Sequence, residues 1–91
     1  MLQVEYTTKF KRDLKLAKRR HQDLMSLRNV MKKIEHEKPL EPRFKDHSLG
    51  GNWVGHRELH VESDWLLIYK LIPDEKVVIF VRTGTHSDLF K

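Results

Sequence analysis

Trp65-Leu66-Leu67-Ile68-Tyr69 is the stretch that decides the fold, because it is nearly all apolar and carries no charge. Such a run is typical of a central strand that is covered on much of both faces. Val77-Val78-Ile79-Phe80-Val81 has the same character, and the intervening Ile72-Pro73-Asp74-Glu75-Lys76 is typical of a turn. We therefore predict an antiparallel pair of strands whose turn places Arg82 opposite about Leu66.

A third strand is predicted ahead of this pair, from Trp53 to Val61. It follows the turn signal Gly50-Gly51-Asn52 and ends at a turn formed by Glu62-Ser63. Its side chains alternate, so one face is expected to carry His56, Glu58 and His60 and the other Arg57, Leu59 and Val61. The short connections favour antiparallel neighbours, and the three strands therefore form a meander.

The first half of the chain predicts one strand and two helices. Residues 2–6 alternate between apolar and polar, as in a strand. Apolar residues then recur at helical spacing after a cap at Thr7 or Thr8, and again after a cap at Asp23. This pattern is typical of a hairpin of two antiparallel helices.

Together these elements predict an α+β domain over residues 1–91, with a mostly antiparallel sheet and both helices on one face. Pro39 and Pro42 mark a loop between the halves, and Thr85-x-x-Asp88 resembles a capping box that opens a short C-terminal helical turn. The chain has no cysteine, and no apolar run approaches the roughly 20 residues of a membrane span. We therefore expect a cytoplasmic protein without a membrane partner.

Positive charge is concentrated in the first half. Residues 1–45 hold thirteen Lys and Arg against six Asp and Glu, whereas residues 46–91 hold five against seven. Much of the excess falls on the outer face of the first predicted helix, at Lys11, Lys15, Lys18 and Arg19. Such a face suits a polyanionic partner such as nucleic acid, and its plainer explanation is a solvated helix surface.

Polar residues of the second half are spaced so that the predicted strands gather them at one edge of the sheet. His60 lies just before a turn and Asp64 just after it, while Arg82 ends the last strand and His86 follows closely. His47 comes from the preceding loop and joins them only through tertiary folding. Imidazoles, a carboxylate and a guanidinium suit metal-free acid–base chemistry on a phosphate.

Each of these residues also has a structural explanation. A surface histidine usually has no function, an arginine at a strand end often satisfies a structural charge, and an aspartate after a turn often forms that turn. Metal binding is a further alternative. The chain lacks a His-Glu-x-x-His motif and a Cys/His knuckle, and His56 and His60 would lie about 13 Å apart along a strand. We therefore expect neither a metal nor a cofactor.

Aromatic residues near the cluster have open roles. Trp65, next to Asp64, either stacks an RNA base or packs in the core. Trp53 is expected to pack at the end of the sheet, and Phe10 and Phe80 are assigned to the core.

Several segments carry a resemblance to a known family: Lys45-Asp46-His47-Ser48-Leu49, residues 51–61, residues 64–70, residues 82–86, and Leu89-Phe90. In combination they resemble the YafQ-type toxins of the RelE/ParE superfamily, from bacterial type II toxin–antitoxin systems. The basic helical hairpin extends the resemblance to essentially the whole chain. It implies a ribosome-dependent endoribonuclease that cuts mRNA in the decoding site, and a cognate antitoxin that silences it.

The resemblance also implies site residues. Those matching His47, His60, Asp64, Arg82 and His86 form the family's active site, and those matching Trp65 and Phe90 help to hold the substrate. Because RNA supplies its own nucleophile, the 2′-hydroxyl, we expect His60 with Asp64 on the general-base side. His86 or His47 would be the general acid, and Arg82 would stabilise charge on the phosphate.

The basic helix face, Lys11, Lys15, Lys18 and Arg19, would then dock on ribosomal RNA, or be covered by an acidic antitoxin. Two other functions stay open. One is a superfamily relative that inhibits a protein such as DNA gyrase, against which the histidines and Arg82 argue. The other is a non-catalytic RNA- or DNA-binding module, although no helix-turn-helix, zinc-finger or RNP signature is present.

Overall fold

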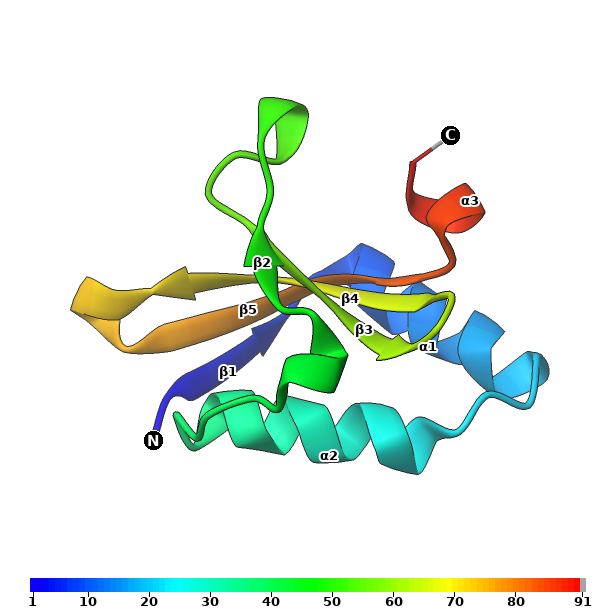
Figure 1. The fold of residues 1–91 in the computed structure, drawn as a ribbon, viewed down its shortest axis with the longest axis horizontal. Coiled ribbons are helices and arrows are strands. Elements are labelled where there is room, and N and C mark those ends of the chain that lie inside the picture. The colour runs from blue at the N-terminus through cyan, green and yellow to red at the C-terminus, as the bar shows by residue number, and fades with distance from the viewer. Residues whose placement is uncertain (91) are drawn as a thin grey trace.

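A five-stranded sheet lies at the centre of the computed structural model, which describes residues 1–90 (Figure 1). In chain order the elements, with η for 3-10 helices, are β1 (Gln3–Tyr6), α1 (Thr8–Arg19), α2 (Leu24–Glu35), η1 (Pro42–Phe44), β2 (His47–Ser48), η2 (Gly51–Trp53), β3 (Arg57–Glu62), β4 (Trp65–Ile72), η3 (Pro73–Glu75), β5 (Val77–Gly84) and α3 (His86–Leu89). The strand order is β1-β5-β4-β3-β2, with β1 parallel to β5 and the other pairs antiparallel. The predicted α+β class is confirmed.

The two long helices begin where side chains can cap them. Thr7 Oγ1 accepts the backbone N–H of Phe10 at 2.9 Å, and Asp23 Oδ1 accepts the N–H of Met25 at 3.1 Å. These bonds satisfy donors that the first helical turn leaves free. In the described part of the chain no helix has the length and apolar character needed to cross a bilayer.

Apolar side chains pack on both faces of β4. Leu67 and Tyr69 belong to a large core that also contains Phe80 of β5 and the buried faces of α1 and α2, among them Phe10 and Leu27. Leu66 and Ile68 alternate with them and form a second, smaller cluster with Leu89, onto which Leu49, Trp53 and Val81 pack. Burial on both faces explains why this strand has no polar alternation.

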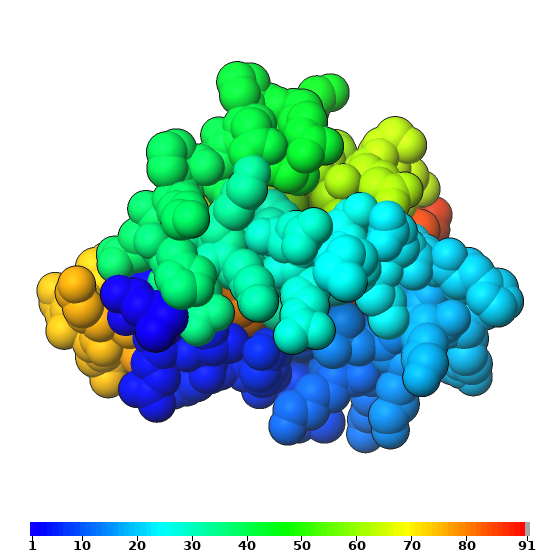
Figure 2. All heavy atoms as spheres, turned by 90° about the horizontal axis from the view of Figure 1, so that it is seen from below, coloured from blue at the N-terminus to red at the C-terminus, as the bar shows by residue number. Residues whose placement is uncertain are grey.

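Different elements border these two faces. Figure 1 shows α2 beneath the sheet, while the loop that contains η2 and the short helix α3 rise above it. The view from below in Figure 2 shows α2 and α1 side by side over the lower face. Between these two elements the upper face is accessible to solvent at His47 and His86, whose side chains are 49% and 56% exposed, and we call it the open face.

The start of the predicted third strand was wrong. β3 begins at Arg57, and Trp53 belongs to η2. Gly51 has a φ of 59° and Gly55 a φ of 87°, left-handed values that favour glycine and turn the chain out of an extended path. An additional short strand, β2, pairs His47 with Glu58, so His47 is part of the sheet and not of a loop.

The predicted register between β4 and β5 also needs correction. Arg82 lies opposite Ile68, and Leu66 lies opposite Gly84. A bulge accounts for part of this shift, because Ile68 pairs with Arg82 whereas Tyr69 pairs with Phe80. Val81 is the extra residue, and such a bulge changes the direction of the side chains that follow it.

Candidate active site

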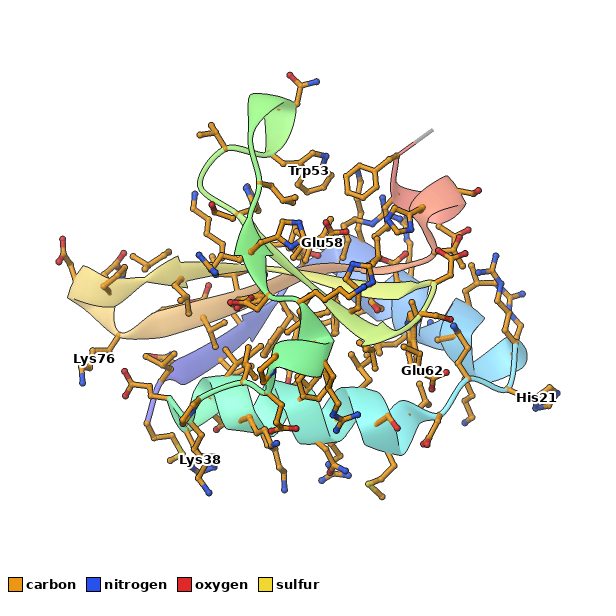
Figure 3. All side chains as sticks on the ribbon, viewed as in Figure 1. His21, Lys38, Trp53, Glu58, Glu62 and Lys76 are labelled. Carbon is orange, nitrogen blue, oxygen red and sulfur yellow. The ribbon has the colours of Figure 1, made fainter. Side chains whose placement is uncertain are left out.

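Cross-strand pairing places polar side chains on the upper face. Two rows of opposed residues cross the sheet there: His47, Glu58, Ile68 and Arg82 in the first, and His60, Leu66 and Gly84 in the second. Opposed residues share a face, and Leu66 and Ile68 lie on the face away from the large helices. Figure 3 shows the labelled Glu58 near the middle of this face, with Trp53 above it.

His86 and Asp64 are in direct contact. His86 donates to Asp64 Oδ1 through its backbone N–H at 3.1 Å and through ring Nδ1 at 3.0 Å. The ring centroids of His86 and His60 are 5.9 Å apart, and His60 Nδ1 lies 3.4 Å from the Ser63 carbonyl. Three of the predicted residues therefore meet, but Asp64 is the partner of His86 and not of His60.

The hydrogen bonds from His86, side chain first and backbone second, lower the pKa of Asp64 below its ordinary 3.8. A lowered folded-state pKa means that the stabilisation is complete above about pH 4 and is lost as the pH falls through the lowered value. We predict that the carboxyl carbon of Asp64, followed by NMR, titrates below 3.8. His86→Ala should raise the midpoint toward the ordinary value, and an unchanged midpoint would show that the contact does not hold in solution.

His47 lies between two acceptors. Its Nε2 is 3.2 Å from Glu58 Oε2, and its Nδ1 is 2.7 Å from the Lys45 carbonyl oxygen. Both ring nitrogens therefore lie within hydrogen-bonding distance of an oxygen. Glu58 is only 5% exposed, and within the described residues its Oε1 has no hydrogen-bond partner. Sequence reasoning placed Glu58 on a face with His60 but gave it no role.

A polar network holds β2 in place next to His47. Arg57 donates to Asp46 Oδ2 from Nη2 at 2.8 Å, and the hydroxyl of Tyr69 donates to the other Asp46 oxygen. Burial, and then the hydrogen bond to Asp46, raise the pKa of Tyr69, so the phenol stays protonated and keeps donating. The short strand that carries His47 is thereby tied to β3 and β4.

Arg82 is ion-paired. Its Nε and Nη2 donate to Asp13 of α1 at 2.9 and 3.0 Å, and Asp13 also accepts the N–H of Thr83 at 3.1 Å. The hydrogen bond with Asp13 is the main cause that raises the pKa of Arg82, so the guanidinium stays charged. Asp13 was missed in the sequence, although it is the only acid in the basic helix from Thr8 to Arg19.

The two aromatic residues predicted to hold the substrate, Trp65 and Phe90, differ in their exposure. Trp65 is 2% exposed within the large core, so its ring is not available to stack a base, and the alternative of core packing holds. Phe90 is 40% exposed, with its centroid 6.0 Å from that of Trp53 and 6.2 Å from that of His86. Trp53 and Phe90 thus border the open face as an aromatic rim.

The basic helix face lies apart from this cluster. A groove of about 620 Å³ runs between α1 and α2, bordered by Lys11, Lys15, Lys18 and Arg28 and floored by Tyr6, Leu14, Leu24, Leu27 and Met31. Arg19 is exposed on the same helix but does not line the groove. The groove belongs to the helical side of the molecule, which Figure 2 shows, so these basic residues do not join the acid–base site.

Among residues 1–90, no three His, Asp or Glu side chains are arranged to hold a metal ion together. What the arrangement offers chemically is a pair of neighbouring imidazoles with carboxylate or carbonyl partners, a third imidazole at His47, the guanidinium of Arg82 and an aromatic rim.

The sheet order, the helix pair and the imidazole-lined open face define a RelE-like α+β domain. Residues 2–91 match the model of a family described as "Bacterial toxin of type II toxin-antitoxin system, YafQ". The chain belongs to this YafQ toxin family.

Individual proteins that resemble this chain point to the same family. The mRNA interferase toxin YafQ of Escherichia coli strain K12 is 47% identical over 88 residues, which are 96% of this chain and 94% of that protein. The crystal structure of the E. coli DinJ-YafQ complex contains a chain with a TM-score of 0.89 and 44% identity, covering 100% of both. A metal-bound toxin from Helicobacter pylori has a TM-score of 0.92 and 40% identity, covering 99% of this chain and 100% of that one.

Proposed function

We propose that this protein is an endoribonuclease toxin that cleaves mRNA in the ribosomal decoding site, in the cytoplasm, by acid–base catalysis without a metal. The observation that carries the proposal is the pair His60 and His86, whose rings lie 5.9 Å apart on an open face. The 47% identical E. coli relative is named an mRNA interferase, which supports RNA as the substrate.

The proposed reaction uses the RNA 2′-hydroxyl as the nucleophile. His60, with Nδ1 on the Ser63 carbonyl, takes the 2′-proton through its free Nε2. The 2′-oxygen attacks phosphorus and the bond to the 5′-oxygen breaks, which leaves a 2′,3′-cyclic phosphate. His86, whose Nδ1 is held by Asp64, gives a proton to the departing 5′-oxygen. Two imidazoles on either side of one phosphodiester can complete this exchange.

Two side chains from the first row of opposed residues across the sheet, Arg82 and His47, would stabilise the phosphate. Arg82 leaves the same face as Ile68 and, although paired with Asp13, keeps 22% of its side chain exposed. His47, whose ring lies beside Glu58 and the Lys45 carbonyl, stands at the other end of the row and would contact the phosphate there. In this proposal Phe90 and Trp53, and not Trp65, stack the bases beside the scissile bond.

The basic helix face is proposed to dock on ribosomal RNA. Lys15→Glu with Lys18→Glu should weaken ribosome binding and flatten its salt dependence by about one unit of log–log slope per lysine. The matched control is Lys38→Glu with Lys76→Glu, two exposed lysines, labelled in Figure 3, that do not line this groove. Equal affinity and slope in both double variants, measured by sedimentation with ribosomes from low to high salt, would leave this face without a docking role.

An antitoxin is the second proposed partner. The E. coli relative YafQ was crystallised together with DinJ, in a structure described as a toxin–antitoxin complex. The groove between α1 and α2 combines an apolar floor with a basic border, which suits an amphipathic segment with acidic flanks. Binding there would cover Lys11, Lys15 and Lys18 and compete with the ribosome.

The decisive test incubates the protein with mRNA-programmed ribosomes at constant Mg²⁺ and maps the new RNA ends, with and without a chelator selective for transition metals and in parallel on free mRNA. Codon-positioned cuts that need the ribosome and persist in the chelator are expected. Loss of cutting in the chelator, with the ribosomes still intact, would point to a transition metal in the toxin, as in the H. pylori structure. DNA damage without mRNA cuts would favour a gyrase-type target, and ribosome binding without cuts would favour a non-catalytic module.

A further inference from the structure

The helix that carries His86 is too short to be stable alone. α3 comprises four residues, His86–Leu89, which is a single turn. A single turn fixes several backbone angles for one or two hydrogen bonds, so its order must come from contacts outside it. What holds α3 therefore holds His86 and the adjoining Phe90 over the open face.

Asp88 is the centre of those contacts. Its Oδ2 accepts the N–H of Thr85 at 2.9 Å, and its own N–H donates to Thr85 Oγ1 at 3.1 Å. Together the two bonds form a capping box at the start of α3. A Cβ on Gly84 would lie 3.0 Å from Asp88, so the side chain of Asp88 is seated directly against the end of β5.

Arg20, distant in sequence, holds the same carboxylate. It donates to Asp88 Oδ2 from Nη1 at 2.7 Å and to Oδ1 from Nη2 at 3.2 Å, across 68 positions of sequence. Arg20 itself is fixed as the C-cap of α1, where its N–H donates to the Leu16 carbonyl at 3.0 Å. Two parallel bonds from a planar guanidinium define orientation as well as distance. The C-terminal end of α1 is thus joined to α3 by a two-bonded ion pair.

We propose that Arg20 is a positioning residue for the reaction, which locks α3 through Asp88 and so sets the place of His86 beside His60. This inference rests on the function proposed above and deepens it. Arg20 touches none of the reacting groups. It acts through Asp88 on one side of α3, while Asp64 holds the His86 backbone on the other.

The test compares Arg20→Ala, Arg20→Lys and Arg12→Ala in single-turnover cleavage on programmed ribosomes. Arg12 is a matched control, because it is an exposed arginine of the same helix with no ion pair among the described residues. Arg20→Ala should lower the rate at saturation about tenfold and change the half-saturating ribosome concentration less than twofold. Arg20→Lys keeps the positive charge but loses the two parallel hydrogen bonds of the guanidinium, so we expect the cleavage rate to fall several-fold. Arg12→Ala should match the wild type.

Amide hydrogen exchange without RNA provides the second readout. The amides of Asp88, Leu89 and Phe90 should exchange faster in Arg20→Ala while those of β4 do not change, which separates loosening of α3 from unfolding. A wild-type rate in Arg20→Ala, unchanged α3 exchange, or a wild-type rate in Arg20→Lys would each overturn the proposal. A wild-type protein that cuts no mRNA would instead defeat the proposed function, which the RNA-free exchange measurement does not assume.

Discussion

Replacing His86 by alanine is expected to slow mRNA cleavage on programmed ribosomes by about a hundredfold to ten-thousandfold, the usual contribution of a positioned acid or base. The same range is expected for His60→Ala. The two rings lie 5.9 Å apart, and each has one nitrogen held by a neighbour and the other free to exchange a proton. The measurement is the single-turnover rate across pH, in which each variant should lose one limb of the profile.

His36→Ala is the matched control, because His36 is exposed at the end of α2, away from the upper face. It should cut at the wild-type rate. The paired result matters more than either variant alone, since replacing both imidazoles should cost little more than replacing one if they act as a unit. Wild-type rates in both His60→Ala and His86→Ala would remove these residues from the reaction.

Trp65→Ala is expected to lower the free energy of unfolding by about 3–5 kcal/mol, as for other large buried aromatic residues. Trp65 is 2% exposed and packs in the core between β4 and the helices. A small domain has a total stability of about 5–15 kcal/mol, so this single change takes a large part of it. Chemical denaturation followed by far-UV circular dichroism measures the loss.

Trp65→Phe separates packing from base stacking. The phenyl ring fills much of the same space and removes the indole Nε1, which has no hydrogen-bond partner in the described part of the chain. This variant should therefore be much more stable than Trp65→Ala and should cut mRNA at close to the wild-type rate. Normal stability in Trp65→Ala, with weakened RNA binding, would instead restore the base-stacking role.

Long, regular patterns in the sequence were enough to predict the main elements. The apolar run from Trp65 to Tyr69 predicted a strand covered on both faces, and the structure packs a core on each. Asp23, and Thr7 or Thr8, are predicted caps because short polar side chains can bond the free N–H groups of a first turn, and the structure uses Asp23 and Thr7. These signals are local, so one sequence carries them in full.

Long-range pairing could not be read in the same way. Asp13 and Arg82 are 69 positions apart, and Arg20 and Asp88 are 68 apart, so nothing local links either pair. Because Asp64 and His60 flank the same turn, the sequence suggests a direct contact between their side chains. In the structure, the start of α3 instead brings the backbone N–H of His86 to the Asp64 carboxylate.

Backbone and burial details were also beyond the pattern. Gly55 reads as one residue of a strand until its positive φ is known, and the bulge at Val81 changes the register by an amount that no alternation rule gives. Trp65 follows a turn, where exposure and burial are equally compatible with the sequence. Only the packing of the helices decides that it is buried.

The most direct test of the central claim is cleavage of a ribosome-bound mRNA that carries a single 2′-deoxynucleotide on the 5′ side of the scissile phosphate. If His60 and His86 transfer protons for an attack by the RNA's own 2′-oxygen, this substrate should bind normally and remain uncut at that position. The all-ribose substrate should yield a 2′,3′-cyclic phosphate and a 5′-hydroxyl. Cutting of the deoxy substrate at the normal rate would contradict the mechanism.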